Sequence, residues 1–80
     1  MYNLYSVRDV NVGWNQPFCE TSDSVAKRGF AYAVNNNDIM GFAPQDFDLY
    51  RVGEFDPETG VISDELPILV CHGMEVCKRD

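Results

Sequence analysis

The strongest constraint on the fold is a β-hairpin predicted between residues 47 and 62. Residues 47–55 alternate in polarity as a strand with two unlike faces does, and Val61 and Ile62 resume the β pattern. Between them, Pro57 supplies a fixed φ and Gly60 a residue that tolerates positive φ, which is typical of a tight turn. The expected faces of the first strand are Phe47, Leu49, Arg51, Gly53 and Phe55 on one side, and Asp48, Tyr50, Val52 and Glu54 on the other.

An amphipathic helix is predicted to begin at residues 21–23. Thr21, Ser22 and Asp23 are consecutive side chains that can accept hydrogen bonds from the free backbone N–H groups of a helix start. Residues 35–38 are expected to end the helix, because asparagine tolerates the left-handed conformation found at helix C-termini. The stripe expected to face the core is Val25, Ala26, Gly29, Phe30, Ala33 and Val34, and the outward side carries Lys27, Arg28, Ala31 and Asn35.

The segments around the helix predict a strand, a loop and a connector. Residues 3–10 are rich in aromatic and β-branched types and predict a first strand. Residues 11–20 contain Gly13 and Pro17 among other turn-forming residues, which predicts a loop. Residues 39–44 are apolar but interrupted by glycine and proline, so we expect an irregular connector there.

The C-terminal part predicts one more strand. Residues 63–65 break the β pattern, and residues 67–71 form a short apolar run that is typical of a buried strand. Residues 74–80 are expected to form one helical turn or a frayed end. Together these patterns predict an α+β fold in which a small antiparallel sheet of three to four strands carries one amphipathic helix packed on one face.

Length and charge limit the size of the molecule and its partners. With 80 residues, of which 45% are hydrophobic, the chain is expected to be a single domain over residues 1–80. Residues 1–10 contain charges and no long apolar run, which predicts neither a secretory signal nor a membrane span. The net charge of −7 opposes approach to phosphate, although a local cluster of the six basic residues can still form a cationic patch.

Three cysteines and a single histidine raise the questions of disulfides, metals and nucleophilic catalysis. The odd number and irregular spacing of Cys19, Cys71 and Cys77 predict reduced thiols. The spacing of Cys71, His72 and Cys77 matches no zinc pattern, and neighbouring residues on a strand point to opposite faces. We therefore expect no metal, no cofactor and no catalysis. A metal-dependent hydrolase or nuclease built on the 13 carboxylates is the least favoured hypothesis.

Cationic and aromatic side chains lie close together in the sequence. Arg51 follows Tyr50 in the predicted hairpin, and Tyr32 lies one helical turn beyond Arg28. Such combinations suit single-stranded nucleic acid, because cations bind its backbone and flat rings stack on its unstacked bases. They are also common on ordinary amphipathic surfaces, so the residues alone leave a protein–protein role open.

Residues 42–60 carry the most specific sequence in the chain, centred on Phe-Asp-Leu-Tyr-Arg-Val-Gly-Glu-Phe-Asp at residues 47–56. With residues 5–9, residues 17–18 and four helix positions, they resemble the small nonstructural protein of gokushovirus-type microviruses over nearly the whole chain. The resemblance implies a DNA-binding phage protein that acts in single-stranded DNA synthesis or genome packaging in the cytoplasm of the bacterial host. The four helix positions are Asp23, Ala26, Arg28 and Phe30.

The leading hypothesis is a noncatalytic phage accessory protein that binds single-stranded DNA as a homodimer, without contact to a membrane. The alternative is a protein-interaction module whose acidic surface binds a phage or host protein and no nucleic acid. The residues expected to bind nucleic acid are Arg8, Trp14, Lys27, Arg28, Tyr32 and Arg51.

Overall fold

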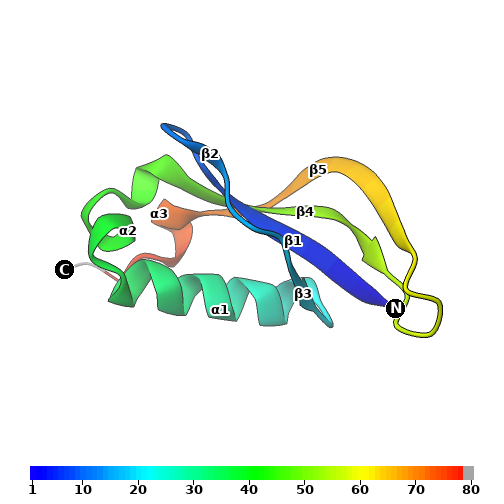
Figure 1. Cartoon of the computed structure of the whole chain (residues 1–80). Coiled ribbons are helices and arrows are strands. Elements are labelled where there is room, and N and C mark those ends of the chain that lie inside the picture. Colours follow the sequence, from blue (N-terminus) through cyan, green and yellow to red (C-terminus); the bar gives the residue numbers. More distant parts are fainter. Residues whose placement is uncertain (79–80) are drawn as a thin grey trace.

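The computed structural model describes residues 1–78 as an antiparallel sheet with the long helix α1 packed across one face (Figure 1). Its principal axes measure 45 × 23 × 17 Å. Within the described residues, no helix is long and apolar enough to cross a membrane. The elements in chain order are β1 (Tyr2–Asp9), β2 (Gly13–Trp14), β3 (Phe18–Glu20), α1 (Asp23–Asn36), α2 (Asp38–Phe42), the 3-10 helix η1 (Pro44–Asp46), β4 (Phe47–Phe55), β5 (Ile62–His72) and α3 (Gly73–Val76).

The sheet confirms the predicted α+β class, and all of its strand pairs are antiparallel. Its order is β2-β1-β4-β5, and β3 also pairs with β1, so the sheet has five strands. The additional strands β2 and β3 lie within residues 11–20, where the sequence predicted only a loop. Both pair with the edge of β1 that β4 leaves free, and Pro17, which has no N–H to donate, lies between them.

Helix α1 begins where the sequence predicts, because the Ser22 hydroxyl accepts a hydrogen bond from the N–H of Val25. Two details of the prediction are wrong. Gly29, expected in the core stripe, is exposed, and Asn37 ends the helix in an extended conformation (φ −97°, ψ 132°) where a left-handed one was expected. The fully buried positions recur every four residues and form a narrower stripe than predicted: Ala26, Phe30 and Val34.

The core lies between this stripe and the sheet. Tyr5 on β1 and Leu49 on β4 are fully inaccessible to solvent. The hydroxyl of Tyr5 donates a 2.6 Å hydrogen bond to the carboxylate of Asp23, which fixes the first turn of α1 to β1. The core cluster consists of Tyr5, Val7, Ala26, Phe30, Val34, Met40, Phe47, Leu49 and Cys71.

Residues 38–42 form the helix α2, where the sequence predicted an irregular connector. The side-chain oxygen of Asn37 accepts hydrogen bonds from the N–H groups of Ile39 and Met40, both at 3.0 Å, and so starts a second helix where α1 ends. Met40 is buried in the core, and this burial holds the short helix in place. Local capping and tertiary burial together override the glycine that suggested irregular structure.

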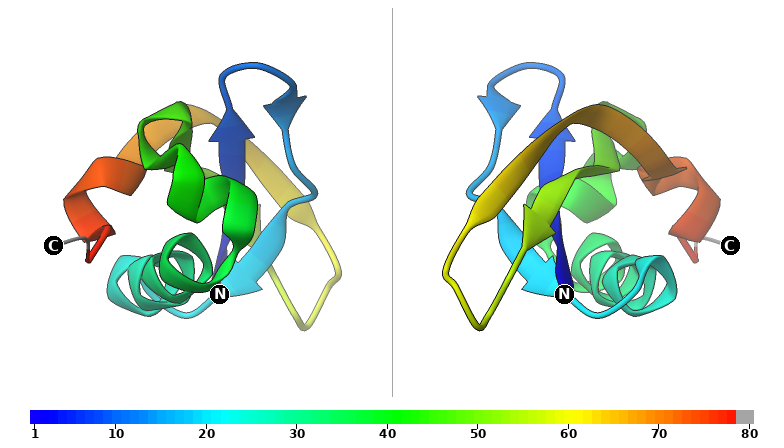
Figure 2. Two further views of the ribbon diagram at one scale, coloured as in Figure 1. Left: turned by 90° about the vertical axis from the view of Figure 1, so that its left-hand side faces the viewer. Right: turned by 90° about the vertical axis from the view of Figure 1, so that its right-hand side faces the viewer.

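Strand β5 departs most from the sequence prediction. It runs for 11 residues through residues 63–65, which were expected to break the pattern. Residues 67–71 were expected to be buried, and Cys71 is. Because β5 lies at the edge of the sheet, however, Pro67, Ile68 and Leu69 are exposed. Figure 2 shows β5 as the outer strand of the long hairpin, next to β4. The expected C-terminal helical turn is present as α3, and residues 79–80 lie outside the described part.

A bulge in β4 changes the faces that simple alternation predicts. The adjacent residues Leu4 and Tyr5 of β1 pair with Gly53 and Arg51 of β4, which leaves Val52 as the extra residue. Gly53 therefore lies on the face opposite to Arg51, whereas the alternation placed both on one face. Gly53 is also closely packed, because a Cβ atom at this position would overlap the backbone oxygen of Ser63.

Candidate nucleic-acid interface

Four side chains form a row across four strands, on the face of the sheet that α1 does not cover. Trp14 on β2 is paired with Arg8 on β1, Arg8 with Asp48 on β4, and Asp48 with His72 on β5. Residues directly opposite each other on neighbouring strands share a face. The residues next to them in the chain, Val7, Leu49 and Cys71, are buried in the core, so the row faces away from it. We call Trp14, Arg8, Asp48 and His72 the cross-strand row.

An aromatic pair and a cation lie at the β2 end of the cross-strand row. The rings of Trp14 and Tyr50 pack edge to face, with centroids 4.9 Å apart and an interplanar angle of 64°. The guanidinium carbon of Arg8 lies 6.0 Å from the centre of the Trp14 ring, at the outer limit of a cation–π contact. Trp14 is 48% exposed, so a flat ligand can still reach its ring. Within residues 1–78, Arg8 forms no ion pair.

A histidine–aspartate pair lies at the β5 end of the row. Nδ1 of His72 is 2.6 Å from Oδ1 of Asp48, whose side chain is 12% exposed. The hydrogen bond that the His72 ring donates to the Asp48 carboxylate raises the pKa of His72 above its ordinary value. Protonation of His72 therefore adds one positive charge to this face and offsets the negative charge of Asp48, which lies opposite Arg8.

Cys71, next to His72, points to the opposite face and is buried in the core. Burial raises the pKa of its thiol to about 11, so the sulfur is protonated at neutral pH. His72 and Cys71 therefore do not face each other, as expected for neighbours on a strand. Among residues 1–78, no three His, Cys, Asp or Glu side chains are grouped closely enough to hold a metal ion.

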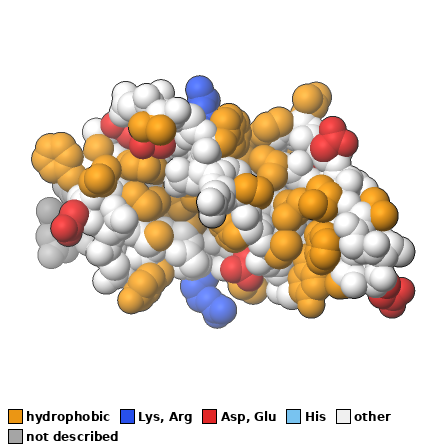
Figure 3. All heavy atoms as spheres, in the orientation of Figure 1, with side chains coloured by type: hydrophobic (Ala, Val, Ile, Leu, Met, Phe, Trp, Pro, Cys, Tyr) orange, Lys and Arg blue, Asp and Glu red, His pale blue; other side chains and the backbone are white. Residues whose placement is uncertain are grey.

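Lys27, Arg28 and Tyr32 lie on α1, away from the cross-strand row. All three are exposed on the outer side of the helix, and Lys27 and Arg28 form no ion pair with any described residue. Figures 1 and 2 place β2 and α1 on opposite sides of the molecule. In Figure 3, Lys and Arg side chains accordingly lie at two separate places, one near β2 and one beneath α1. The structure thus places Arg8 on a different surface from Lys27 and Arg28.

Arg51 belongs to neither surface. It pairs in register with Tyr5, so it lies on the face of the sheet that is opposite to the cross-strand row. Its Nε is 3.2 Å from Oε1 of Glu65, and the two side chains are 30% and 33% exposed. This partly exposed ion pair offsets the charge of the guanidinium, and the structure does not bring Arg51 together with Arg8 and Trp14.

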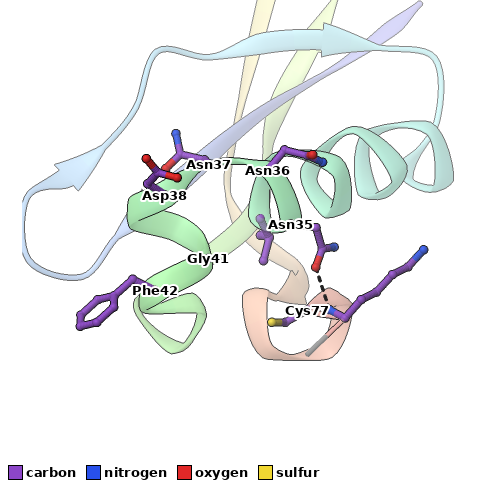
Figure 4. A pocket seen from close by; sticks show the side chains of 9 residues that line it. Asn35, Asn36, Asn37, Asp38, Gly41, Phe42 and Cys77 are labelled. Atoms are coloured by element: carbon purple, nitrogen blue, oxygen red, sulfur yellow. Dashed lines mark hydrogen bonds between the residues drawn. The ribbon is translucent and has the colours of Figure 1, made fainter. Parts of the chain in front are cut away.

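The end of α1 carries amide side chains that bind the C-terminal segment. Asn35 donates hydrogen bonds to the carbonyl oxygens of Ala31 (2.7 Å) and Val76 (3.0 Å), and its side-chain oxygen accepts one from the N–H of Lys78 (2.7 Å; Figure 4). Two hollows of about 430 Å³ each flank this contact, one towards α2 and one along the outer side of α1. Asn35, Asn36 and Lys78 line both hollows.

Residues 2–76 match the model of a family described as the phage ORF5 protein. The chain belongs to this family. No curated protein and no solved structure matches the chain. The match to the phage ORF5 family model therefore shows a phage protein.

In this phage ORF5 protein, two residues of the candidate interface are among those expected from the sequence, and three are not. Arg8 and Trp14 were expected to bind nucleic acid, and the pairing of β1 with β2 brings them together. Tyr50, Asp48 and His72 were not among the expected binding residues, although alternation placed Asp48 and Tyr50 on one face. The missing information was the register of β4 and β5 against β1, because register decides which side chains are direct neighbours.

Proposed function

We propose that this phage ORF5 protein is a noncatalytic accessory protein that binds single-stranded DNA through the cross-strand row and Tyr50. We further propose that it acts in DNA synthesis or genome packaging of a gokushovirus-type microvirus, in the cytoplasm of the bacterial host. The observation that carries the proposal is the cluster of Arg8, Trp14 and Tyr50 on one face of the sheet. These are the two kinds of group that an unpaired strand needs, a cation for its phosphates and flat rings for its bases.

The state of the Arg8 guanidinium supports the proposal. In a chain with a net charge of −7, a cation already paired with a carboxylate offers little attraction to a phosphate. Arg8 has no such partner within the described residues, whereas Arg51 is paired with Glu65. The exposed ring of Trp14 lies beside it and the partly buried ring of Tyr50 packs against that ring, so one nucleotide can place its phosphate on Arg8 and its base on the indole.

Trp14 makes a direct test possible, because it is the single tryptophan of the chain. A base that stacks on the indole is expected to quench its fluorescence, and titration with a short single-stranded oligonucleotide then gives an affinity. Loss of one phosphate contact in Arg8→Gln is expected to weaken binding by about tenfold. Lys27→Gln removes the same charge from outside the interface and measures the effect of net charge alone.

The salt dependence of the titration separates phosphate binding from other contacts. Binding to phosphates releases counterions, so the affinity is expected to fall as salt rises, and the slope is expected to be shallower for Arg8→Gln. A wild-type protein that gives no quenching at low salt would refute the proposal. Equal losses in Arg8→Gln and Lys27→Gln would refute the assignment of the interface.

A second candidate function is binding of a phage or host protein, and the exposed apolar strand β5 favours it. Leu66 is 88% exposed, and Ile68 and Leu69 lie close to it on the same edge strand. The proline at position 67 and two irregularities in the pairing with β4 disfavour extension of the sheet by another strand, so a partner would cover side chains. Co-purification from infected cells with wild type and Leu66→Ser tests this role, which predicts a stoichiometric protein partner lost in the variant.

A further inference from the structure

The outer side of α1 carries a groove of about 430 Å³ that lies away from the cross-strand row. It is formed by residues 28–36 of α1 together with the segment that follows α3. The side chains around it are cationic, aromatic or amide, apart from one alanine, and no carboxylate lines it within the described part of the chain. Its lining residues are Arg28, Ala31, Tyr32, Asn35, Asn36 and Lys78.

The groove depends on a tertiary contact that brings two distant cations together. Asn35 holds the backbone of Val76 and Lys78 against α1 through its amide and its side-chain oxygen, and the dashed line at Asn35 in Figure 4 marks the second of these hydrogen bonds. Lys78 thereby lines the same groove as Arg28, although the two residues are far apart in the sequence. The side chain of Asn36 in turn donates to the carbonyl oxygen of Tyr32, 2.8 Å away.

The chemistry of the groove suits a nucleotide. Arg28 and Lys78 form no ion pair within residues 1–78, so both cations are available to an external anion. Tyr32 is 72% exposed and lines the same groove as the two cations. Two cations and an exposed ring, in a groove that no carboxylate of residues 1–78 lines, would bind a phosphate together with an unstacked base.

The groove and the cross-strand row lie on opposite sides of the molecule. Trp14 lies on β2, the groove lies on α1, and Figures 1 and 2 place these elements on opposite sides. The body of the domain lies between them, so neighbouring nucleotides of one strand cannot occupy both. We propose that the α1 groove is a second site for single-stranded DNA, and that one molecule bridges two strand segments. The bridging rests on the proposed function of the cross-strand row, whereas the groove itself does not.

Bridging can be measured with two oligonucleotides. One is fixed to beads and saturated with protein, and capture of a second, fluorescent oligonucleotide is then recorded after unbound protein has been removed. Wild type is expected to capture the second oligonucleotide. Arg28→Gln and Lys78→Gln, which change exposed side chains, are each expected to reduce its affinity by about tenfold while Trp14 quenching by the first oligonucleotide is retained. Lys27→Gln, one residue away on the same helix, again measures the effect of charge alone.

The outcomes separate the two proposals. The bridging proposal is overturned if the wild type shows Trp14 quenching but captures no second oligonucleotide. It is also overturned if Arg28→Gln and Lys78→Gln capture as well as the wild type, which would indicate bridging by two copies through their sheet faces. Absence of Trp14 quenching would refute the sheet-face proposal instead. Fluorescence anisotropy of a labelled oligonucleotide then tests the groove alone. If the groove binds DNA, Arg28→Gln and Lys78→Gln must bind the oligonucleotide more weakly than Lys27→Gln does.

Discussion

The hydrogen bond between Tyr5 and Asp23 is the clearest place to test what holds α1 on the sheet. Tyr5 is fully buried in β1, and its hydroxyl donates to Asp23 in the first turn of α1. The same hydroxyl accepts a 3.0 Å hydrogen bond from the side-chain amide of Asn3. Burial, followed by the hydrogen bond to the Asp23 carboxylate, raises the pKa of Tyr5, so the phenol is a protonated donor throughout the neutral range. Tyr5→Phe removes this link and leaves the ring in place.

Tyr5→Phe lowers the free energy of unfolding because it leaves the Asp23 carboxylate and the Asn3 amide without their shared partner. A hydrogen bond to a charged group contributes roughly 1.5–3 kcal/mol to stability. Asp23 is an exposed residue at the helix start, so water can replace the lost donor and the expected loss falls to about 1–2 kcal/mol. For a domain of this size, that loss corresponds to a fall in Tm of about 5–15 °C.

The assay is thermal and urea unfolding followed by circular dichroism, with Tyr2→Phe as the matched control. Tyr2 lies on the same strand, and its hydroxyl makes no side-chain hydrogen bond within the described residues. The control is expected to change the unfolding free energy by less than about 0.5 kcal/mol. Equal stabilities of the two variants would show that the hydroxyl does not hold α1 to β1.

Three further predictions concern stability and assembly. The contact with Asp48 raises the pKa of His72, so it stabilises the fold fully below the unfolded pKa of about 6.5. This contribution to the unfolding free energy is lost as pH rises through the folded pKa. The unfolding free energy of His72→Gln should lack this pH dependence. Gly73→Ala should lower the unfolding free energy by about 1–3 kcal/mol, because the added Cβ would overlap the carbonyl oxygen of Pro44. Gly29→Ala should raise it by roughly 0.5–1 kcal/mol, because Gly29 lies in a helix with open space around it. The opposite order of stabilities in urea unfolding would contradict the packing. If the protein is a homodimer that packs through β5, sedimentation velocity should show wild type as a dimer and Leu66→Ser as a monomer, and an unchanged dimer in the variant would place the contact elsewhere.

The local signals in the sequence predicted the elements that depend on short-range chemistry. The hairpin of β4 and β5 turns at residues 56–60, where Gly60 has a positive φ of 76°, and α1 begins at the predicted cap. Strands β2 and β3 were not predicted, because each is too short to show a periodic pattern and forms only by pairing with β1. Residues 67–71 resemble a buried strand in composition, and only the strand order reveals that they lie at the sheet edge.

The sequence predicted which types of residue form the candidate interface but not which individual residues lie in it. Cations and aromatic residues on predicted surfaces indicated nucleic acid, and Arg8 and Trp14 do lie together. Residues that are equally suitable by type were separated by the fold, since Arg51 turns to the other face and pairs with Glu65. Lys78 joined Arg28 only through the hydrogen bonds of Asn35, which span more than half of the chain.

The sequence alone determined the α+β class, the start of α1, the turn of the long hairpin and the surplus of negative charge, because each depends on residue type and short-range spacing. The tertiary structure decided which cations stay free, which aromatic rings meet and which face of the molecule each of them occupies. Those properties depend on strand order, on register and on the bulge at Val52. A shift of one residue in any strand moves its side chains to the other face, and no local pattern in the chain fixes that choice.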